Sequence, residues 1–347
     1  MSPTTSHSQK PLLAPPPEQY WAEHKNDPAH AHHAAAAGSM GEDDPWWNKA
    51  VVALMPLVPP VMVWPLAKRY VAGASLADMD AAVARLNAAG CRCMVNILGE
   101  YATTQAEARA TAEAYKATMA HLAQADHHAN ITVKLTSLGL LVDQALCRQL
   151  ATELVEAAAT HKRFVRFEME DSSLTSDIID LYLAVRASRP ADCQQVGIVI
   201  QAYLRRSLDD VRRICQAGAG HFRLCKGIYR EPRWLAYHQP ELVNKNYVRL
   251  LEEMLQAGAY VGIATHDEQL VWEAVNLIDR LGLTTEHYEF QMLMGVDEPL
   301  RQMLVAAHHP VRVYVPYGQQ WHAYSLRRFK ENPKIARYVL NNLLGGH

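Results

Sequence analysis

The sequence predicts an α/β fold, a (β/α)8 TIM-like barrel with N-terminal lead-in helices and a final helix that covers the functional site. Eight short runs with strand character recur along the chain, and stretches rich in Ala and Leu with helical periodicity lie between them. Strands that alternate with helices over about 250 residues are typical of a closed parallel barrel rather than an open sheet. Little chain follows the helix that begins near Tyr324, so we expect the eighth unit to end the protein.

The elements follow one another in a regular order. The expected strands are residues 92–98, 131–136, 164–169, 196–201, 222–226, 260–264, 287–292 and 311–315. The helical stretches between them include residues 76–89, 104–125, 143–160 and 241–257.

Composition divides the chain into three parts. Residues 1–45 are rich in Pro, Ala, His, Ser and Asp, and they bury too little apolar surface to offset their ordering entropy, so we expect a flexible segment. We expect residues 46–74 to be lead-in structure packed on the barrel, and residues 75–347 to form the barrel. The start of the chain has neither the apolar run of a signal peptide nor the arginines of a transit peptide. The apolar residues 50–66 are too few and too rich in proline to span a bilayer.

Charge and cysteine content exclude several classes of protein. A net charge of −2 over 347 residues offers no basic face to a nucleic acid. The six cysteines are scattered, with no CxxC pair and no Cys/His cluster, which argues against a disulfide framework or a zinc site. We therefore expect reduced cysteines in a cytoplasmic protein that binds no metal.

Charged residues interrupt two of the expected strands. Alternation along residues 131–136 places Thr132, Lys134 and Thr136 on one face. On the next strand Arg166, Glu168 and Glu170 share a face, and Val165, Phe167 and Met169 fill the other. Charges inside a barrel require compensation, which Lys134 and Arg223 could supply. A structural ion pair between Lys134 and Glu168 or Glu170 explains this pattern as well as a functional site does.

Polar residues also stand near the ends of later strands. Gln201 ends the fourth, and alternation places Arg223 inward on the fifth, before Gly227, which lets a phosphate or ring approach the backbone closely. The sixth and seventh are expected to end in Thr265-His266-Asp267 and Glu289-Phe290-Gln291. Because barrel enzymes gather their chemistry at the carboxyl ends of the strands, these clusters predict a site there. For His266 alone, a core histidine with satisfied hydrogen bonds is the alternative.

The last helix carries Tyr324, Arg327, Arg328 and Glu331. Arg327 and Glu331 are four residues apart and can pair, as they would on a solvated surface helix. Two adjacent guanidinium groups also suit a bidentate clamp on a carboxylate. The chain has no glycine-rich nucleotide fingerprint, because Gly218-Ala219-Gly220 precedes a strand and lacks the third glycine. The residues by themselves indicate an anion-binding barrel enzyme.

Two motifs carry a resemblance to a known family. The run from Arg223 to Pro232 resembles the RLxKGxYxEP segment of proline dehydrogenases, and residues 324–332 are similar to their YxxRRxxEN signature. Shorter matches follow the family's order at residues 69–73, 98–100, 264–267 and 289–291. The resemblance covers about residues 65 to 347.

The resemblance implies a distorted (β/α)8 barrel that holds FAD without a Rossmann domain. It implies oxidation of L-proline to Δ1-pyrroline-5-carboxylate, by hydride transfer from C5 to flavin N5, as the first step of proline catabolism. Electrons would pass to a quinone, so a cytoplasmic protein with peripheral contact at the inner face of the membrane is expected.

The resemblance also assigns roles to individual residues. Glu168 and Arg223 would be catalytic, with Arg223 hydrogen-bonded to flavin N5. The substrate would be bound by Lys134, Leu293, Tyr314, Tyr324, Arg327 and Arg328. FAD would be held by Met169, Gln201, Arg223, Lys226, Gly227, Ile228, Thr265 and His266. Glu331 would support the arginine clamp, and Glu100 would pair with the same arginines when the site closes.

The chain departs from the family at two positions. Glu168 stands where the family usually has aspartate, and Asn96 stands where an acid is expected. An added methylene can move a carboxylate by about 1 Å, which in a positioned site can cost ~10²-fold in rate. Tyr314 is retained, whereas hydroxyproline-preferring members tend to have a smaller residue, and this favours proline.

Three other functions are compatible with parts of this pattern. A related flavoenzyme could oxidise hydroxyproline, pipecolate or N-methylproline. A lyase could form a Schiff base on Lys134 or Lys226. A flavin-free binding protein would need only the arginine clamp. Bound flavin distinguishes proline dehydrogenase from the last two, and a substrate panel distinguishes it from the first.

Overall fold

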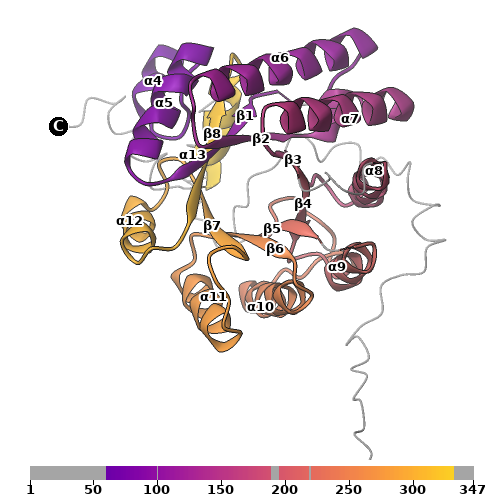
Figure 1. The fold of residues 1–347 in the computed structure, drawn as a ribbon, viewed down its shortest axis with the longest axis vertical. Helices are drawn as coiled ribbons and strands as arrows, with labels where there is room; N and C mark the ends of the chain where they lie inside the picture. Colours follow the sequence, from indigo (N-terminus) through magenta and orange to yellow (C-terminus); the bar gives the residue numbers. More distant parts are fainter. Residues whose placement is uncertain (1–59, 100, 189–194, 219, 332–347) are drawn as a thin grey trace, which may run out of the picture.

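The computed structural model describes residues 60–99, 101–188, 195–218 and 220–331. Within them, eight parallel strands close into one barrel in which sequence neighbours pair and β8 returns to β1 (Figure 1). The strands are β1 (Arg92–Ile97), β2 (Ala129–Val133), β3 (Val165–Phe167), β4 (Val196–Gln201), β5 (His221–Cys225), β6 (Tyr260–Ala264), β7 (Tyr288–Leu293) and β8 (Val311–Tyr317). The predicted (β/α)8 fold is confirmed. The segment 1–45, expected to be flexible, lies outside the described residues.

Helices alternate with the strands and surround the barrel in Figure 1. They are α4 (Pro60–Ala67), α5 (Leu76–Ala88), α6 (Gln105–Gln124), the short 3₁₀ helix η3 (Leu135–Leu138), α7 (Gln144–Thr160), α8 (Thr175–Ala187), α9 (Ser207–Gln216), α10 (Pro240–Gln256), α11 (Glu268–Arg280), α12 (Glu298–Ala306) and α13 (Trp321–Glu331). None of the described helices is long and apolar enough to cross a membrane.

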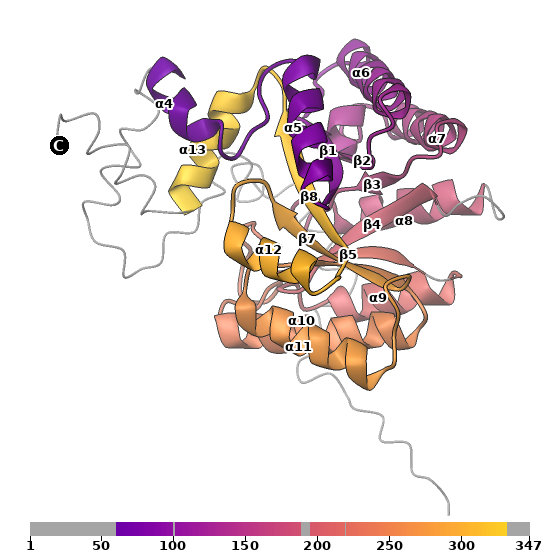
Figure 2. The ribbon, with the colours of Figure 1, turned by 60° about the vertical axis from the view of Figure 1, so that its left-hand side comes forward.

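The first and last described helices lie side by side, at the left of Figure 2. Val63 and Ala67 of α4 form an apolar cluster with Leu326 of α13. Trp64 and Trp321 meet edge to face, with their ring centroids 4.9 Å apart. Packing against α4 therefore holds α13 beside the barrel.

Polar side chains cap several helices at their amino ends. Ser75 Oγ accepts a hydrogen bond from the Asp78 amide, and the Asp78 carboxylate accepts one from the Ser75 amide at 2.9 Å, which makes a capping box. Asp267 caps α11 in the same position, accepting from the Gln269 amide at 3.0 Å. Because α11 begins so soon after β6, this cap also fixes the loop that carries Thr265 and His266.

Strands β2 and β3 end earlier than predicted. Their last register pair is Val133 with Phe167, after which Lys134 leads into η3. The Glu168 amide still donates to the Val133 carbonyl at 2.9 Å. Beyond this bond, β2 no longer runs beside the chain that follows β3. Lys134 and Glu168 still reach the predicted face, but strand pairing no longer sets the faces of the residues that follow them.

One predicted strand end is wrong. Glu289 is the second residue of β7, so it lies at the amino end of the barrel rather than the carboxyl end. There Arg312 Nε and Nη2 donate to its two carboxylate oxygens at 2.6 and 3.0 Å. Leu293 occupies the carboxyl end of β7 instead. The six residues of β7 extend from one end of the barrel to the other. Glu289 and Gln291 of the same motif therefore lie at different depths inside the barrel.

Candidate active site

A cavity of about 540 Å³ opens at the carboxyl ends of the strands, as the clusters of polar residues predict. Thirteen residues to which the sequence assigns a role line it together: Lys134, Glu168, Met169, Gln201, Arg223, Lys226, Gly227, Ile228, Thr265, His266, Leu293, Tyr314 and Tyr324. Glu100 lies outside the described residues, as do the side chains of Arg327, Arg328 and Glu331. The barrel thus brings residues that lie on seven of its eight strands or directly after them, together with Tyr324 of α13, to one concave surface.

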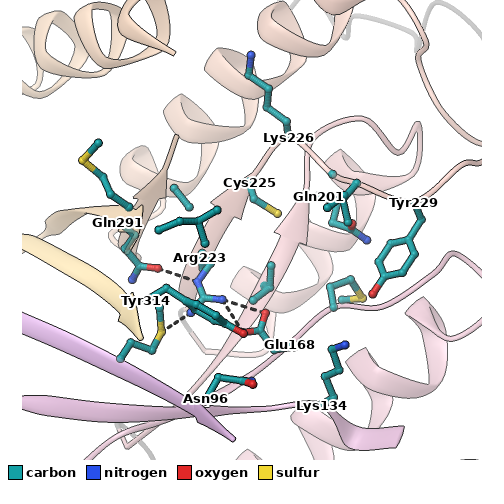
Figure 3. Close-up of a pocket in the computed structure, with 18 of the residues that line it drawn as sticks. Asn96, Lys134, Glu168, Gln201, Arg223, Cys225, Lys226, Tyr229, Gln291 and Tyr314 are labelled. Atoms are coloured by element: carbon teal, nitrogen blue, oxygen red, sulfur yellow. Dashed lines mark hydrogen bonds and ion pairs between the residues drawn. The ribbon is translucent and has the colours of Figure 1, made fainter. Parts of the chain in front are cut away.

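Arg223 lies at the centre of this cavity (Figure 3). Its Nη1 donates to both oxygens of Glu168, at 2.8 and 2.9 Å, and its Nε donates to Gln291 Oε1 at 2.7 Å. Glu168 also accepts a short hydrogen bond from Thr132 Oγ1. Only 7% of the Arg223 side chain and 13% of the Glu168 side chain are exposed, so this ion pair is largely withdrawn from water. A guanidinium group is therefore fixed where it can act on a bound molecule.

Aromatic and sulfur groups complete the surroundings of Arg223. Its guanidinium carbon lies 5.8 Å from the centroid of the Tyr314 ring, within the range of a cation–π interaction. Burial raises the pKa of Tyr314 well above its ordinary value, and the nearby Glu168 carboxylate acts in the same direction. Arg223 Nη2 contacts Met94 Sδ. Tyr314 therefore lies in the cavity as a neutral phenol.

Met169 shows why strict alternation misassigned one strand. The pattern placed Met169 on the outer face and Glu170 beside Glu168, but the cavity is lined by Glu168 and Met169 and not by Glu170. Since β3 ends at Phe167, residues 168–170 form a loop rather than an extended strand. The prediction of three charged groups on one face of this strand is wrong for Glu170.

Glu170 lies behind the cavity with 1% of its surface exposed. Thr136 donates to it twice, from Oγ1 at 2.6 Å and from its amide at 3.2 Å. Burial raises the pKa of Glu170 to about 7, although the bonds from Thr136 and the charge of Lys134 act in the opposite direction. The positive charge of Lys134 thus acts to lower the pKa of Glu170, and Lys134 also lines the cavity.

Replacing Glu170 with glutamine should raise the free energy of unfolding at pH 8 by on the order of 2 kcal/mol. The carboxyl has an ordinary pKa of 4.5, but in the folded protein burial raises this pKa to about 7. Wild-type stability should therefore fall as the pH rises between these values, whereas glutamine stays neutral throughout. Urea unfolding of both proteins at pH 5 and pH 8 measures the effect. An equal difference between the proteins at both pH values would contradict this origin.

The opposite side of the cavity carries a second set of charges. Lys226 Nζ donates to Asp267 Oδ2 at 2.6 Å, and Asn244 Nδ2 donates to the same oxygen at 3.0 Å. His266 Nε2 accepts a hydrogen bond from the Leu293 amide at 3.0 Å, so the ring proton of a neutral His266 is on Nδ1. His266 is thus hydrogen-bonded, as the core-histidine alternative expects, and it also lines the cavity.

Gly227 has a backbone conformation that favours glycine, with φ at +109°. A Cβ atom placed there would lie 2.1 Å from a ring carbon of Tyr203. The close approach that the sequence predicts for a ligand is thus made by Tyr203 in this structure.

Several residues that line the cavity were not predicted. Nothing in the sequence marks Met94 of β1 or the following Tyr101 as functional, because a methionine in a strand and a tyrosine in a loop are common without any function. Cys225 also lines the cavity and could have been found, since it lies two residues after Arg223 on the same strand and so on the same face.

No metal site accompanies these residues. Within the described part of the chain, no group of three or more His, Cys, Asp or Glu side chains could hold a metal ion. The five cysteines that the structure describes are free thiols.

A family profile and similar curated proteins point to the same family. A family profile described as proline dehydrogenase matches residues 79–339. The chain is 31% identical over 278 residues to proline dehydrogenase 1 of Bacillus subtilis, and this alignment covers 80% of the chain and 90% of that protein. It is 33% identical over 291 residues to proline dehydrogenase of Deinococcus radiodurans, covering 82% of the chain and 92% of that protein.

Solved structures support the fold. The chain resembles proline utilization A (PutA) of Bdellovibrio bacteriovorus, inactivated by N-propargylglycine, with a TM-score of 0.71 and 21% identity. This match covers 78% of the chain but only 33% of that larger protein, so the chain spans about a third of its length. Taken together, the length of the profile match and the near-complete coverage of two relatives show that this chain belongs to the proline dehydrogenase family.

Proposed function

We propose that this protein is an FAD-dependent proline dehydrogenase that oxidises L-proline to Δ1-pyrroline-5-carboxylate. The observation that carries the proposal is the Arg223 guanidinium, held by Glu168 and Gln291 in the cavity of a barrel of this family. A fixed and largely buried cation suits a cofactor and substrate on which charge changes during reaction.

The residues of the cavity fit FAD. Arg223 supplies a donor for the flavin ring, and Lys226, 37% exposed, supplies a cation for the diphosphate. Asn244 Oδ1 is buried and accepts no hydrogen bond from the described protein atoms, although its Nδ2 donates to Asp267. Asn244 is not among the residues that line the cavity, so it supports the site through its bond to Asp267, which does line it. Met169, Gln201, Gly227, Ile228, Thr265 and His266 line the same surface and would complete the cofactor site.

We assign the substrate to the part of the cavity near Lys134 and Tyr314. Lys134, with Arg327 and Arg328 of α13, would bind the carboxylate of proline, and Leu293, Tyr314 and Tyr324 would enclose its ring. Tyr324 is buried and lines the cavity, which supports a position for α13 over the substrate. Glu331 would support the clamp from the same helix, and Glu100 would pair with it in a closed site.

The side chains of the site would act by alignment and by exclusion of water. When bound, FAD supplies the two-electron chemistry by accepting the hydride that leaves proline C5. Lys134 and the arginine clamp would fix the carboxylate, so that C5 faces the cofactor within reacting distance. The apolar walls from Leu293 and Tyr314 favour the neutral ring amine, which releases hydride more readily than the ammonium form. Glu168 would hold Arg223 in place throughout.

We propose a quinone as the electron acceptor, as the resemblance to the family implies. Peripheral contact with a membrane would bring a quinone to the mouth of the cavity. A stopped-flow experiment that compares the rates at which a soluble quinone and dioxygen reoxidise the proline-reduced protein tests this assignment. Reoxidation of the proline-reduced protein by dioxygen at the same rate as by quinone would argue against it.

The purified protein should bind FAD without a covalent bond, be yellow, and lose its visible absorption when proline is added in the absence of air. The measurement is an absorption spectrum before and after proline, with the cofactor released by heat and identified by mass. A colourless protein that cannot be reconstituted with FAD would overturn the proposed function. So would a yellow protein that proline does not bleach.

Replacing Arg327 or Arg328 with methionine should raise the KM for proline by about 10- to 100-fold while FAD stays bound. Each change removes a charge-assisted hydrogen bond to the substrate carboxylate and keeps much of the side chain's length. Steady-state kinetics with an artificial electron acceptor measures KM, and the flavin absorption confirms loading. Wild-type kinetics in both variants would show that α13 does not bind the substrate.

A further inference from the structure

Oxygen acceptors hold Arg223 at two of its nitrogens, and Met94 Sδ, a weak acceptor, contacts the third. Glu168 accepts from Nη1 only, and Gln291 accepts from Nε at 2.7 Å. A guanidinium group is planar, so contacts at Nη1 and Nε together define the plane in which it lies. If Glu168 were its only oxygen acceptor, the group could turn about that attachment, because a thioether sulfur holds Nη2 only weakly. The orientation of Arg223 in the cavity therefore depends on Gln291 as well as on its charged partner.

Gln291 is itself held in one orientation. Its Nε2 donates to Glu289 Oε1 at 2.8 Å, while its Oε1 faces Arg223. If the amide were reversed, its NH₂ group would face the N–H of Arg223 and its oxygen would face the Glu289 carboxylate. Both contacts would then be repulsive. The ionised carboxylate of Glu289 thus determines which end of the Gln291 amide reaches Arg223.

Glu289 stays ionised although it is 1% exposed. Burial acts to raise its pKa, but the charge of Arg312 and hydrogen bonds from Arg312 and Gln291 lower this pKa to about 2. Arg312 donates to both of its oxygens, at 2.6 and 3.0 Å. A chain of buried polar groups therefore runs from Arg312 at the amino end of the barrel, through Glu289 and Gln291, to Arg223 in the cavity.

The neighbouring strand leaves space for this chain. Gly262 of β6 is in register with Glu289 of β7. A Cβ atom at Gly262 would lie 2.3 Å from Gln291 Nε2 and 2.6 Å from its Cδ. The backbone of Gly262 is not left-handed, so alanine could adopt its conformation. Glycine is required there because the Gln291 amide occupies the volume that a side chain would fill.

We propose that Gln291, oriented by Glu289, is a positioning residue that sets the plane of the Arg223 guanidinium and through it the reactivity of the bound cofactor. This inference rests on the proposed function. A misaligned cation stabilises the negative charge of a reduced flavin less well. Loss of Gln291 should therefore slow flavin reduction and make the midpoint potential of the bound flavin more negative, with little change in the affinity for proline.

The experiment compares Gln291→Leu with Asp210→Asn, a control on the outside of the barrel. Asp210 is 6% exposed and pairs with Arg206 at 2.8 Å, so its substitution also disturbs a buried polar contact. For each protein we would measure thermal stability, the rate of anaerobic reduction by proline, the Kd for proline and the midpoint potential. In Gln291→Leu the reduction rate should fall by about 10²-fold, with a Kd within about twofold of wild type. Asp210→Asn should lose stability only.

Gly262→Ala is a second way to move the Gln291 amide away from Arg223, because the added Cβ would occupy the volume of that amide. It leaves every hydrogen-bonding group of the chain in place and moves only the Gln291 amide, so it should lower the reduction rate and the potential in the same directions. A crystal structure of either variant should show the Arg223 guanidinium turned from its wild-type plane.

The outcomes separate the inference from the function on which it rests. Wild-type protein that takes up no FAD would overturn both. Wild-type protein that proline reduces, together with wild-type rates and potentials in Gln291→Leu and in Gly262→Ala, would overturn the inference alone. If Gln291→Leu does not fold, Gly262→Ala decides the question by the same measurements.

Discussion

Replacing Arg223 with methionine should lower the rate at which proline reduces the bound FAD by about 10³-fold. The guanidinium is the cation at the centre of the cavity, and methionine keeps some of its bulk without its charge or its donors. Rapid mixing of the oxidised protein with proline in the absence of air measures this rate directly. Arg223→Lys should recover only part of it, because a lysine retains the charge and loses the planar pair of contacts to Glu168 and Gln291.

Two controls separate chemistry from stability in this experiment. Methionine at position 223 leaves the Glu168 carboxylate buried without its cation, which can cost about 3–5 kcal/mol of stability. The double variant Arg223→Met, Glu168→Gln removes both charges, so its stability should recover while its reduction rate stays low. Arg212→Met is the surface control, since Arg212 pairs with Glu253 at 2.7 Å and its side chain is 47% exposed. A double variant that recovers its rate together with its stability would show that Arg223 acts only on the fold.

Replacing Glu168 with alanine should lower kcat/KM for proline by about 10²-fold. The reason is electrostatic, because Glu168 accepts two hydrogen bonds from Arg223 and one from Thr132 in a largely buried position. Without the carboxylate, the Arg223 cation lacks its counter-charge and one of the contacts that fix it. Steady-state kinetics over a range of proline concentrations measures the change.

Glu168→Asp tests why this chain has the longer acid. If the position simply tolerates glutamate, the aspartate variant should keep or improve kcat/KM for proline. If the added methylene adapts the site to another cyclic imino acid, the variant should gain activity on proline and lose it on hydroxyproline, pipecolate or N-methylproline. Asn96, also in the cavity where an acid was expected, is the neighbouring position to vary next. Unchanged kcat/KM for Glu168→Ala on all four substrates would remove Glu168 from the site.

Much of the fold follows from the sequence because its signals are local. The strand runs have strand composition, and their order with the helices predicts a closed parallel barrel. Inward placement of Arg223 follows from alternation within β5, where the backbone is extended throughout. Two motifs, around residues 223–232 and 324–332, indicate the family because they combine many specific residues at fixed spacing.

Only the tertiary structure decides where alternation stops and which buried groups meet. The β2–β3 ladder ends at Val133 and Phe167 because the chain after β2 turns into η3, and this brings Met169 rather than Glu170 to the cavity. Glu289 lies at the amino end of the barrel because β7 begins one residue before it, a boundary set by pairing with β6 and β8. The pairing of Arg223 with Gln291 joins residues 68 positions apart. The sequence determines which groups each strand turns inward, whereas closure of the barrel determines which of them come within hydrogen-bonding distance.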